Sequence, residues 1–177
     1  MRKVLLVAVF AAMVFALTAS AAGTVNFAGT WEFDKAKSQN PPRTWQDAES
    51  VVMTITQTDK QLTIDMKVTG GNPPSGGPGG GRGFGGMMGP STFNLDGTEN
   101  VTESERGKST TKAAWSKDGK TFELNTTRVF NTPNGEVTAT TTEKLSLSED
   151  GKVLTNVRHT ESPRGPQDST LVFNKKG

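Results

Sequence analysis

The residues with the most chemical potential are charged side chains that interrupt an apolar alternation in the C-terminal half of the chain. Arg128 has the parity of Phe122 and Leu124, and Glu143 has the parity of Leu145. Residues of one parity point to one face of a strand, so both charges are expected on an apolar face. Ions there are costly unless they pair with each other or meet a charged ligand. The pattern indicates either a structural ion pair or a site for a carboxylate- or phosphate-bearing ligand, which an arginine fork grips well.

Two turns would bring further polar side chains to these charges. If Asn134-Gly135 is a two-residue turn, Thr126 pairs with Glu143 and Arg128 pairs with Thr141. If Asp150-Gly151 closes a three-residue loop, His159 lies across from Thr141, whereas a slip of one residue would send His159 to the other face. The predicted ligand site combines this polar cluster with aromatic walls, and its members are Thr126, Arg128, Thr141, Glu143 and His159, with Trp31, Phe93, Trp115 and Phe122.

Catalysis has little support in the residue types. The chain has one histidine, no cysteine and no tyrosine, which removes most general bases and activated thiols. Its serines lie in turns or on polar strand faces, and no Gly-x-Ser-x-Gly elbow is present. A transition-metal site needs more ligands than His159 and scattered carboxylates. We therefore expect a non-enzymatic protein without a metal or an organic cofactor.

The elements that must position these residues are strands. Apolar and polar residues alternate over residues 51–55, 62–68, 111–115, 122–130, 137–147, 153–161 and 169–175, with shorter strands at 93–95 and 100–105. Asp-Gly and Asn-Gly pairs lie between these runs, which is the strongest short-range hairpin signal in a sequence. About ten strands joined in order by short turns predict a single antiparallel up-and-down barrel of 8–10 strands. A two-sheet sandwich is the alternative.

The first strand organises the predicted barrel. Phe27, Gly29, Trp31 and Phe33 share one parity, so all four point to one face. Glycine two residues before tryptophan lets another segment close down over the indole. The following polar segment, residues 34–50, is expected to be a loop with one helical turn after Pro42. It is either a surface loop with a docked tryptophan or a lid.

The first 22 residues have the features of a signal peptide. A basic start at Arg2 and Lys3 precedes the apolar run 4–17 and the small residues 19–21. We expect residues 23–177 to form one exported domain, periplasmic or secreted, with no membrane insertion after cleavage. Loss of Arg2 and Lys3 leaves 18 basic against 18 acidic residues. This neutral domain does not indicate binding to nucleic acid.

A glycine- and proline-rich insertion interrupts the strand pattern at residues 69–90. Eleven of the 20 glycines lie here, so the segment buries little and should be a floppy excursion between two strands. Its single arginine and two adjacent methionines are too few for a nucleic-acid tract or a copper site. It could still act as a flexible arm that contacts a protein partner.

The Gly29-Thr30-Trp31 strand followed by an antiparallel meander resembles the calycins, which include lipocalins, fatty-acid-binding proteins and avidins. More closely, the chain is similar to exported bacterial lipocalin-like domains of uncharacterised function. Matching pieces lie at residues 27–38, 52–57, 127–130, 143–154 and 171–173. The resemblance implies a barrel, and an arginine near the last strand that packs on the motif tryptophan, for which Arg158 is the nearest candidate.

Two functions follow as alternatives. One is an exported carrier or sensor that holds a small, mostly apolar ligand, anionic at one end, inside the barrel. The other is a structural or protein-interaction module of the cell envelope that uses the glycine-rich arm. The resemblance does not decide between them, because calycins carry many unrelated ligands on one barrel.

Overall fold

A computed structural model describes residues 24–70, 90–104, 107–132 and 135–177 of the chain. The predicted signal peptide lies outside the described residues, and so does the glycine-rich insertion apart from Thr69, Gly70 and Pro90. The described chain contains ten strands and one short helix, in the order β1 (Gly29–Phe33), α1 (Arg43–Gln46), β2 (Ser50–Gln57), β3 (Gln61–Thr69), β4 (Ser91–Asn94), β5 (Asn100–Ser104), β6 (Gly107–Trp115), β7 (Thr121–Thr132), β8 (Gly135–Leu147), β9 (Val153–Glu161) and β10 (Gln167–Lys175).

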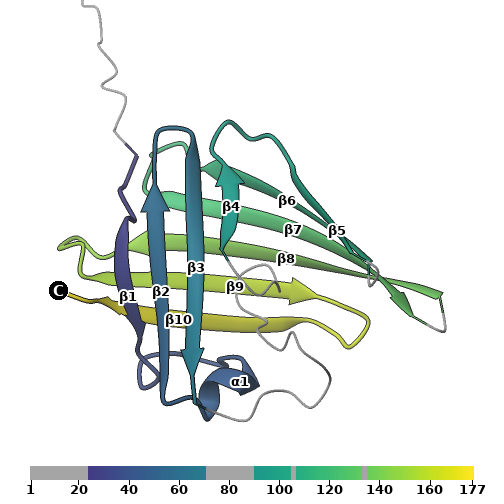
Figure 1. The fold of residues 1–177 in the computed structure, drawn as a ribbon, viewed down its shortest axis with the longest axis horizontal. Coiled ribbons are helices and arrows are strands. Elements are labelled where there is room, and N and C mark those ends of the chain that lie inside the picture. Colours follow the sequence, from purple (N-terminus) through teal and green to yellow (C-terminus); the bar gives the residue numbers. More distant parts are fainter. Residues whose placement is uncertain (1–23, 71–89, 105–106, 133–134) are drawn as a thin grey trace, which may run out of the picture.

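The strands form one antiparallel sheet in the order β4-β3-β2-β1-β10-β9-β8-β7-β6-β5. Consecutive strands pair except at β4 and β5, which are the two edges, and β1 joins β10 through the register pair Trp31↔Lys175. Figure 1 shows β1 to β4 crossing β6 to β10 at a steep angle, so the sheet curls until its inner faces meet. The predicted up-and-down barrel is confirmed as a nearly closed ten-stranded sheet, and the sandwich is not observed.

Trp31 lies at the centre of the apolar half of this barrel. Its side chain is 0% exposed, and its indole N–H donates a hydrogen bond to the carbonyl oxygen of Phe27 at 2.9 Å. The ammonium of Lys175 lies 5.4 Å from the ring centre. Gly29 has φ +144°, and a Cβ there would lie 3.2 Å from Lys175 Cε. The glycine therefore leaves room for the lysine stem beside the indole, and the expectation that another segment closes over the indole is confirmed.

Lys175, rather than Arg158, is the cation that packs on the motif tryptophan. Arg158 was the nearest sequence candidate for that role, but β9 pairs it with Glu143 on β8. Lys175 has the required place because the register of β1 and β10 sets it directly opposite Trp31. The expectation for Arg158 was wrong, since chain position alone does not fix which strand lies beside β1.

The segment between β1 and β2 forms a strap with a docked tryptophan. The helical turn expected after Pro42 is present as α1, and it carries Trp45, whose side chain is buried. The Trp45 ring meets Phe33 edge-on with 5.2 Å between centroids and Phe173 at 6.1 Å. Gln39 and Thr170 exchange backbone hydrogen bonds of 2.7 and 3.0 Å. These contacts fix the strap against the end of the barrel.

The β6–β7 and β8–β9 hairpins share one turn sequence, Ser-x-Asp-Gly-Lys, 32 positions apart. In the second copy, Ser148 Oγ–H donates to Asp150 Oδ1 at 2.6 Å, and Ser148 Oγ accepts the N–H of Val153 at 2.9 Å. Ser116 makes the same two bonds, at the same lengths, to Asp118 and Thr121 in the first copy. The serine therefore fixes a four-residue loop in both hairpins.

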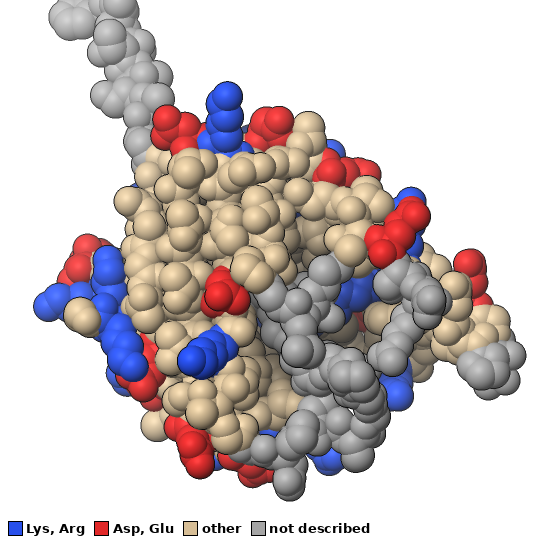
Figure 2. All heavy atoms as spheres, in the orientation of Figure 1, with Lys and Arg blue, Asp and Glu red and all other residues tan. Residues whose placement is uncertain are grey.

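Charged side chains are dispersed on the face drawn in Figure 2. Lysine, arginine, aspartate and glutamate side chains lie mostly at its margins, and both signs are interspersed. The broad area over β1 to β3 is mainly uncharged in this view. On this face the charges form neither a basic patch nor an acidic patch.

Candidate functional site

Strand register arranges the inward-facing residues of β5 to β10 in rows that cross the sheet. One row carries only hydrogen-bonding side chains, and its members are Asn100, Thr111, Thr126, Thr141, Thr160 and Gln167, one from each of the six strands. We call this row the polar belt. Within it, the hydroxyls of Thr111 and Thr126 lie 3.0 Å apart, and those of Thr141 and Thr160 lie 3.2 Å apart.

A charged pair lies in the row next to the polar belt, on the side of the apolar core. Glu143 on β8 and Arg158 on β9 are register partners, with 3.6 Å between Glu143 Oε1 and Arg158 Nε. The Nδ2 of Asn156 donates to Glu143 Oε2 at 3.3 Å. Glu143 is 5% exposed and Asn156 is 1% exposed. A carboxylate is therefore held inside the barrel by one long hydrogen bond and one cation.

Burial governs the titration of Glu143. Removal from water disfavours the charged carboxylate, so burial raises the pKa of Glu143 above its ordinary value. Arg158, Asn156 and Arg128 act in the opposite direction and lower the pKa, without overcoming the effect of burial. Glu143 is therefore poised to accept a proton more readily than a surface glutamate.

The predicted β7–β8 register was two residues off. A turn at Asn134-Gly135 would pair Thr126 with Glu143 and Arg128 with Thr141, whereas the structure pairs Thr126 with Thr141. Arg128 lies opposite Ala139. A shift of two preserves parity, so Arg128 and Glu143 share the inner face as predicted, but they are not diagonal neighbours. The reason is that the ladder closes at Thr132↔Gly135, so Gly135 belongs to the strand and the connection lies one position earlier in the chain than predicted.

The predicted β8–β9 register was one residue off, and this moves His159 to the outer face. The Ser148 hydrogen bonds make the loop four residues long instead of three, so Leu147 pairs with Leu154 and Thr141 with Thr160. A slip of one residue exchanges the two faces of a strand. The expectation that His159 joins the interior cluster was wrong, and Arg158 takes the inward place.

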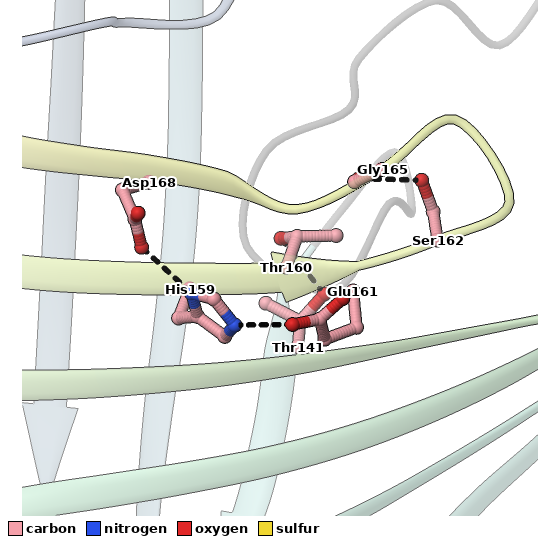
Figure 3. Close-up of polar contacts among 7 residues, drawn as sticks. All are labelled: Thr141, His159, Thr160, Glu161, Ser162, Gly165 and Asp168. Atoms are coloured by element: carbon pink, nitrogen blue, oxygen red, sulfur yellow. Dashed lines mark hydrogen bonds and ion pairs between the residues drawn. The ribbon is translucent and has the colours of Figure 1, made fainter.

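His159 lies between two carboxylates on the outside of the barrel. Its Nδ1 is 2.6 Å from Asp168 Oδ1 on β10, and its Nε2 is 3.0 Å from Glu161 Oε1 on β9. Figure 3 shows the imidazole held between these two groups. Hydrogen bonds from Asp168 and then Glu161 raise the pKa of His159. The arrangement favours the imidazolium form and leaves the histidine exposed.

The aromatic residues of the predicted site pack against each other in the apolar half. Trp31, Phe93 and Phe122 are buried members of one hydrophobic cluster, and half-buried Trp115 packs against it. Trp115 stacks on Phe27 with 5.6 Å between ring centroids and lies 5.1 Å from Phe122. Side chains therefore fill this half. Trp115 and Phe122 also lie one row from the Glu143–Arg158 pair, which joins the aromatic and polar parts of the site.

Two surface hollows lie outside the barrel interior. The first is lined by the β2–β3 turn at residues 58–61 and by residues 94–96 after β4. The second is lined by outward-facing residues of β5 to β8, among them Glu103, Lys108 and Val129. Both are open to solvent, and neither contains a residue of the predicted site.

Sequence reasoning missed several inward-facing polar residues, namely Asn100, Thr111, Asn156, Thr160 and Gln167, and did not place Arg158 in the cluster. The Ser-x-Asp-Gly-Lys repeat could have placed Thr111 and Arg158 on the inner face. Its 32-residue offset aligns Thr111 with Glu143 and Thr126 with Arg158. Thr126 and Glu143 are predicted to face inward. The residues aligned with them, Arg158 and Thr111, should therefore face inward as well.

Residues 24–70, 90–104, 107–132 and 135–177 contain no group of three or more His, Cys, Asp or Glu side chains arranged for a metal ion. Within the same ranges, no helix has the length and hydropathy to cross a bilayer. No protein-family model matches the chain, and a search of curated proteins gives no match.

One solved structure matches the chain. It is the zebrafish ileal bile acid-binding protein in complex with cholic acid, which is 13% identical, with a TM-score of 0.49 over 85% of this chain and 98% of that chain.

Proposed function

We propose that this protein binds a small amphipathic molecule at the inner surface of its barrel and does not catalyse a reaction. The polar head of the ligand would meet the polar belt and the Glu143–Arg158 pair. Its apolar part would extend toward Trp115 and Phe122. The fold and the adjacency of these rows support the proposal. We further propose that binding takes place outside the cytoplasm, as the predicted signal peptide implies.

Buried polar atoms without a partner carry this proposal. Asn156 Oδ1, Asn100 Nδ2 and Arg158 Nε are each shielded from solvent and lack a hydrogen-bond partner among the described residues. An unpaired buried polar group costs about 1–3 kcal/mol, so such groups in native proteins usually meet water or a ligand. All three face inward: Asn100 lies in the polar belt, Arg158 in the row beside it, and Asn156 in the following row, opposite Leu145.

The composition of the site favours binding over catalysis. Threonine hydroxyls of the polar belt bond to one another and have no adjacent imidazole, because His159 lies on the outer face. Two donors, Asn100 Nδ2 and Arg158 Nε, and one acceptor, Asn156 Oδ1, would orient a polar head. The filled apolar half limits the ligand to a head group with a short apolar part.

Co-purification and a probe series test the proposal. Native mass spectrometry and solvent extraction of protein purified from its own host should reveal a bound small molecule. In parallel, butan-1-ol and butane-1-sulfonate should shift the tryptophan fluorescence of the mature protein, since Trp115 borders the site. The Arg158→Lys variant should weaken sulfonate binding, and the outer-face variant Glu123→Gln should not. Protein that carries no small molecule and responds to neither probe would contradict the proposal.

A further inference from the structure

Three ionisable groups face the interior between β5 and β9, of which two are basic and one is acidic. Arg128 on β7 and Arg158 on β9 are cations, and Glu143 on β8 is the single acid among the described inward positions. The inward-facing buried residues of the opposite wall are uncharged, namely Val51, Met53, Ile55, Leu62, Ile64 and Phe93. Glu143 and Arg158 balance each other in charge when the acid is ionised, and the buried Arg158 Nε, which has no hydrogen-bond partner among the described residues, favours an anionic ligand.

Glu143 and an incoming anion would compete for the same cation. Arg158 Nε lies 3.6 Å from Glu143 Oε1, which is too long for a hydrogen bond, and Nε has no such partner among the described residues. An anion that binds Arg158 would therefore lie within a few ångströms of the Glu143 carboxylate. Two negative groups that share a dry site do not both stay ionised, and the weaker acid takes the proton.

We infer that the head group of the ligand is an anion that binds Arg158, and that Glu143 takes up one proton from solvent when the anion binds. This inference rests on the proposed function. An O–H bond forms on a Glu143 carboxylate oxygen, the carboxyl becomes neutral, and the charge of Arg158 then balances the ligand. Asn156 Nδ2, now 3.3 Å from Oε2, remains a donor to the neutral acid.

The other groups around Glu143 are consistent with this assignment. Along β8, its inward neighbours are Thr141 and Leu145, and its cross-strand partner on β7 is Leu124. Ser169 on β10 extends the same row beyond Arg158. Among the described residues, the charged groups that act on Glu143 are Arg158 and Arg128. The proton therefore has one acceptor at this site.

A permanently ionised probe tests the inference, because it cannot take up the proton itself. Butane-1-sulfonate is titrated into the mature protein by calorimetry between pH 5 and 8, in two buffers with different ionisation enthalpies. The difference in heat gives the number of protons bound. We expect uptake that approaches one proton at the upper end of this range, and an affinity that falls about tenfold per pH unit there. Binding of the sulfonate without proton uptake would overturn the inference while leaving the proposed function standing.

Variants assign the proton to Glu143. In Glu143→Gln, sulfonate binding should proceed without proton uptake and with an affinity that no longer depends on pH. The control Glu123→Gln removes an outer-face carboxylate, 3.4 Å from Lys144, and should keep the uptake. Uptake that persists in Glu143→Gln would refute the assignment.

Two further outcomes separate this inference from the proposed function. Binding of butan-1-ol but not of the sulfonate would overturn the anion assignment alone, and binding of neither would overturn both. If Glu143→Gln does not fold, infrared spectroscopy of the unmodified protein replaces it. A protonated-carboxyl band should then grow on addition of sulfonate at pH 7, and its absence would refute proton uptake.

Discussion

The ammonium of Lys175 lies 5.4 Å from the centre of the Trp31 ring, on the strand that pairs directly with the strand of the tryptophan. Gly29 makes this approach possible, because a Cβ at that position would meet the lysine stem. The first and last strands are thus joined by a side-chain contact in addition to their backbone ladder. This relationship supplies the first prediction.

Replacing Lys175 by methionine should keep the apolar stem and remove the cation from the indole. A cation–π contact contributes about 0.5–1 kcal/mol at a partly exposed site, so the free energy of unfolding should fall by about that amount in urea titrations. Lys176→Met is the control, since Lys176 pairs with Glu32 across 3.7 Å at the exposed surface. Equal losses in the two variants would show that the ring contact contributes nothing.

The stability of Glu143→Gln relative to the unmodified protein should increase with pH. The pKa of Glu143 is raised in the folded state by burial. Its stabilising contribution is therefore complete below the unfolded value, about 4.3, and is lost as pH rises through the folded pKa. Urea unfolding of both proteins from pH 4 to pH 8 measures the difference, with Glu123→Gln as control. A constant difference over this range would contradict a raised pKa.

His159 should titrate above the ordinary range of histidine, and it can be followed as the single imidazole signal of the chain by NMR. Asp168→Asn should lower its pKa more than Glu161→Gln does, because the Asp168 contact is the larger cause of the raised pKa. The associated stability is fully present below about pH 6.5, the unfolded pKa, and is lost as pH rises through the folded pKa. Identical titration curves in all three proteins would refute the paired arrangement.

The two copies of the Ser-x-Asp-Gly-Lys turn should contribute equally to stability. Ser116→Ala and Ser148→Ala each remove a hydroxyl that donates to an aspartate and accepts a backbone N–H. Each loss should cost about 1–2 kcal/mol, and the double variant should lose the sum because the two turns share no contact. Thermal unfolding measures this. A loss in one copy alone would mean that the shared hydrogen bonds do not determine the stability of both turns.

Alternation and Asp-Gly signals were sufficient for the strands and their order, because side-chain parity and turn chemistry are local properties. The same signals did not determine the register of the strands, since Asp-Gly suits loops of three residues and of four residues alike. The choice at Asp150 is made by Ser148, which accepts the N–H of Val153 and thereby adds one residue to the loop. That single residue decides whether His159 or Arg158 enters the barrel. Parity predicted the burial of Glu143, but it did not predict that Arg158 would be the partner of Glu143.

The β1–β10 ladder also has a consequence for the order of folding. Trp31 and its partner Lys175 are separated by almost the whole described chain, so shielding of the indole must await the arrival of the C-terminal strand. Contacts this distant in sequence make folding slow. A nascent chain that lacks β10 would leave its first strand paired on one side only, which would keep the polypeptide open until β10 has been synthesised.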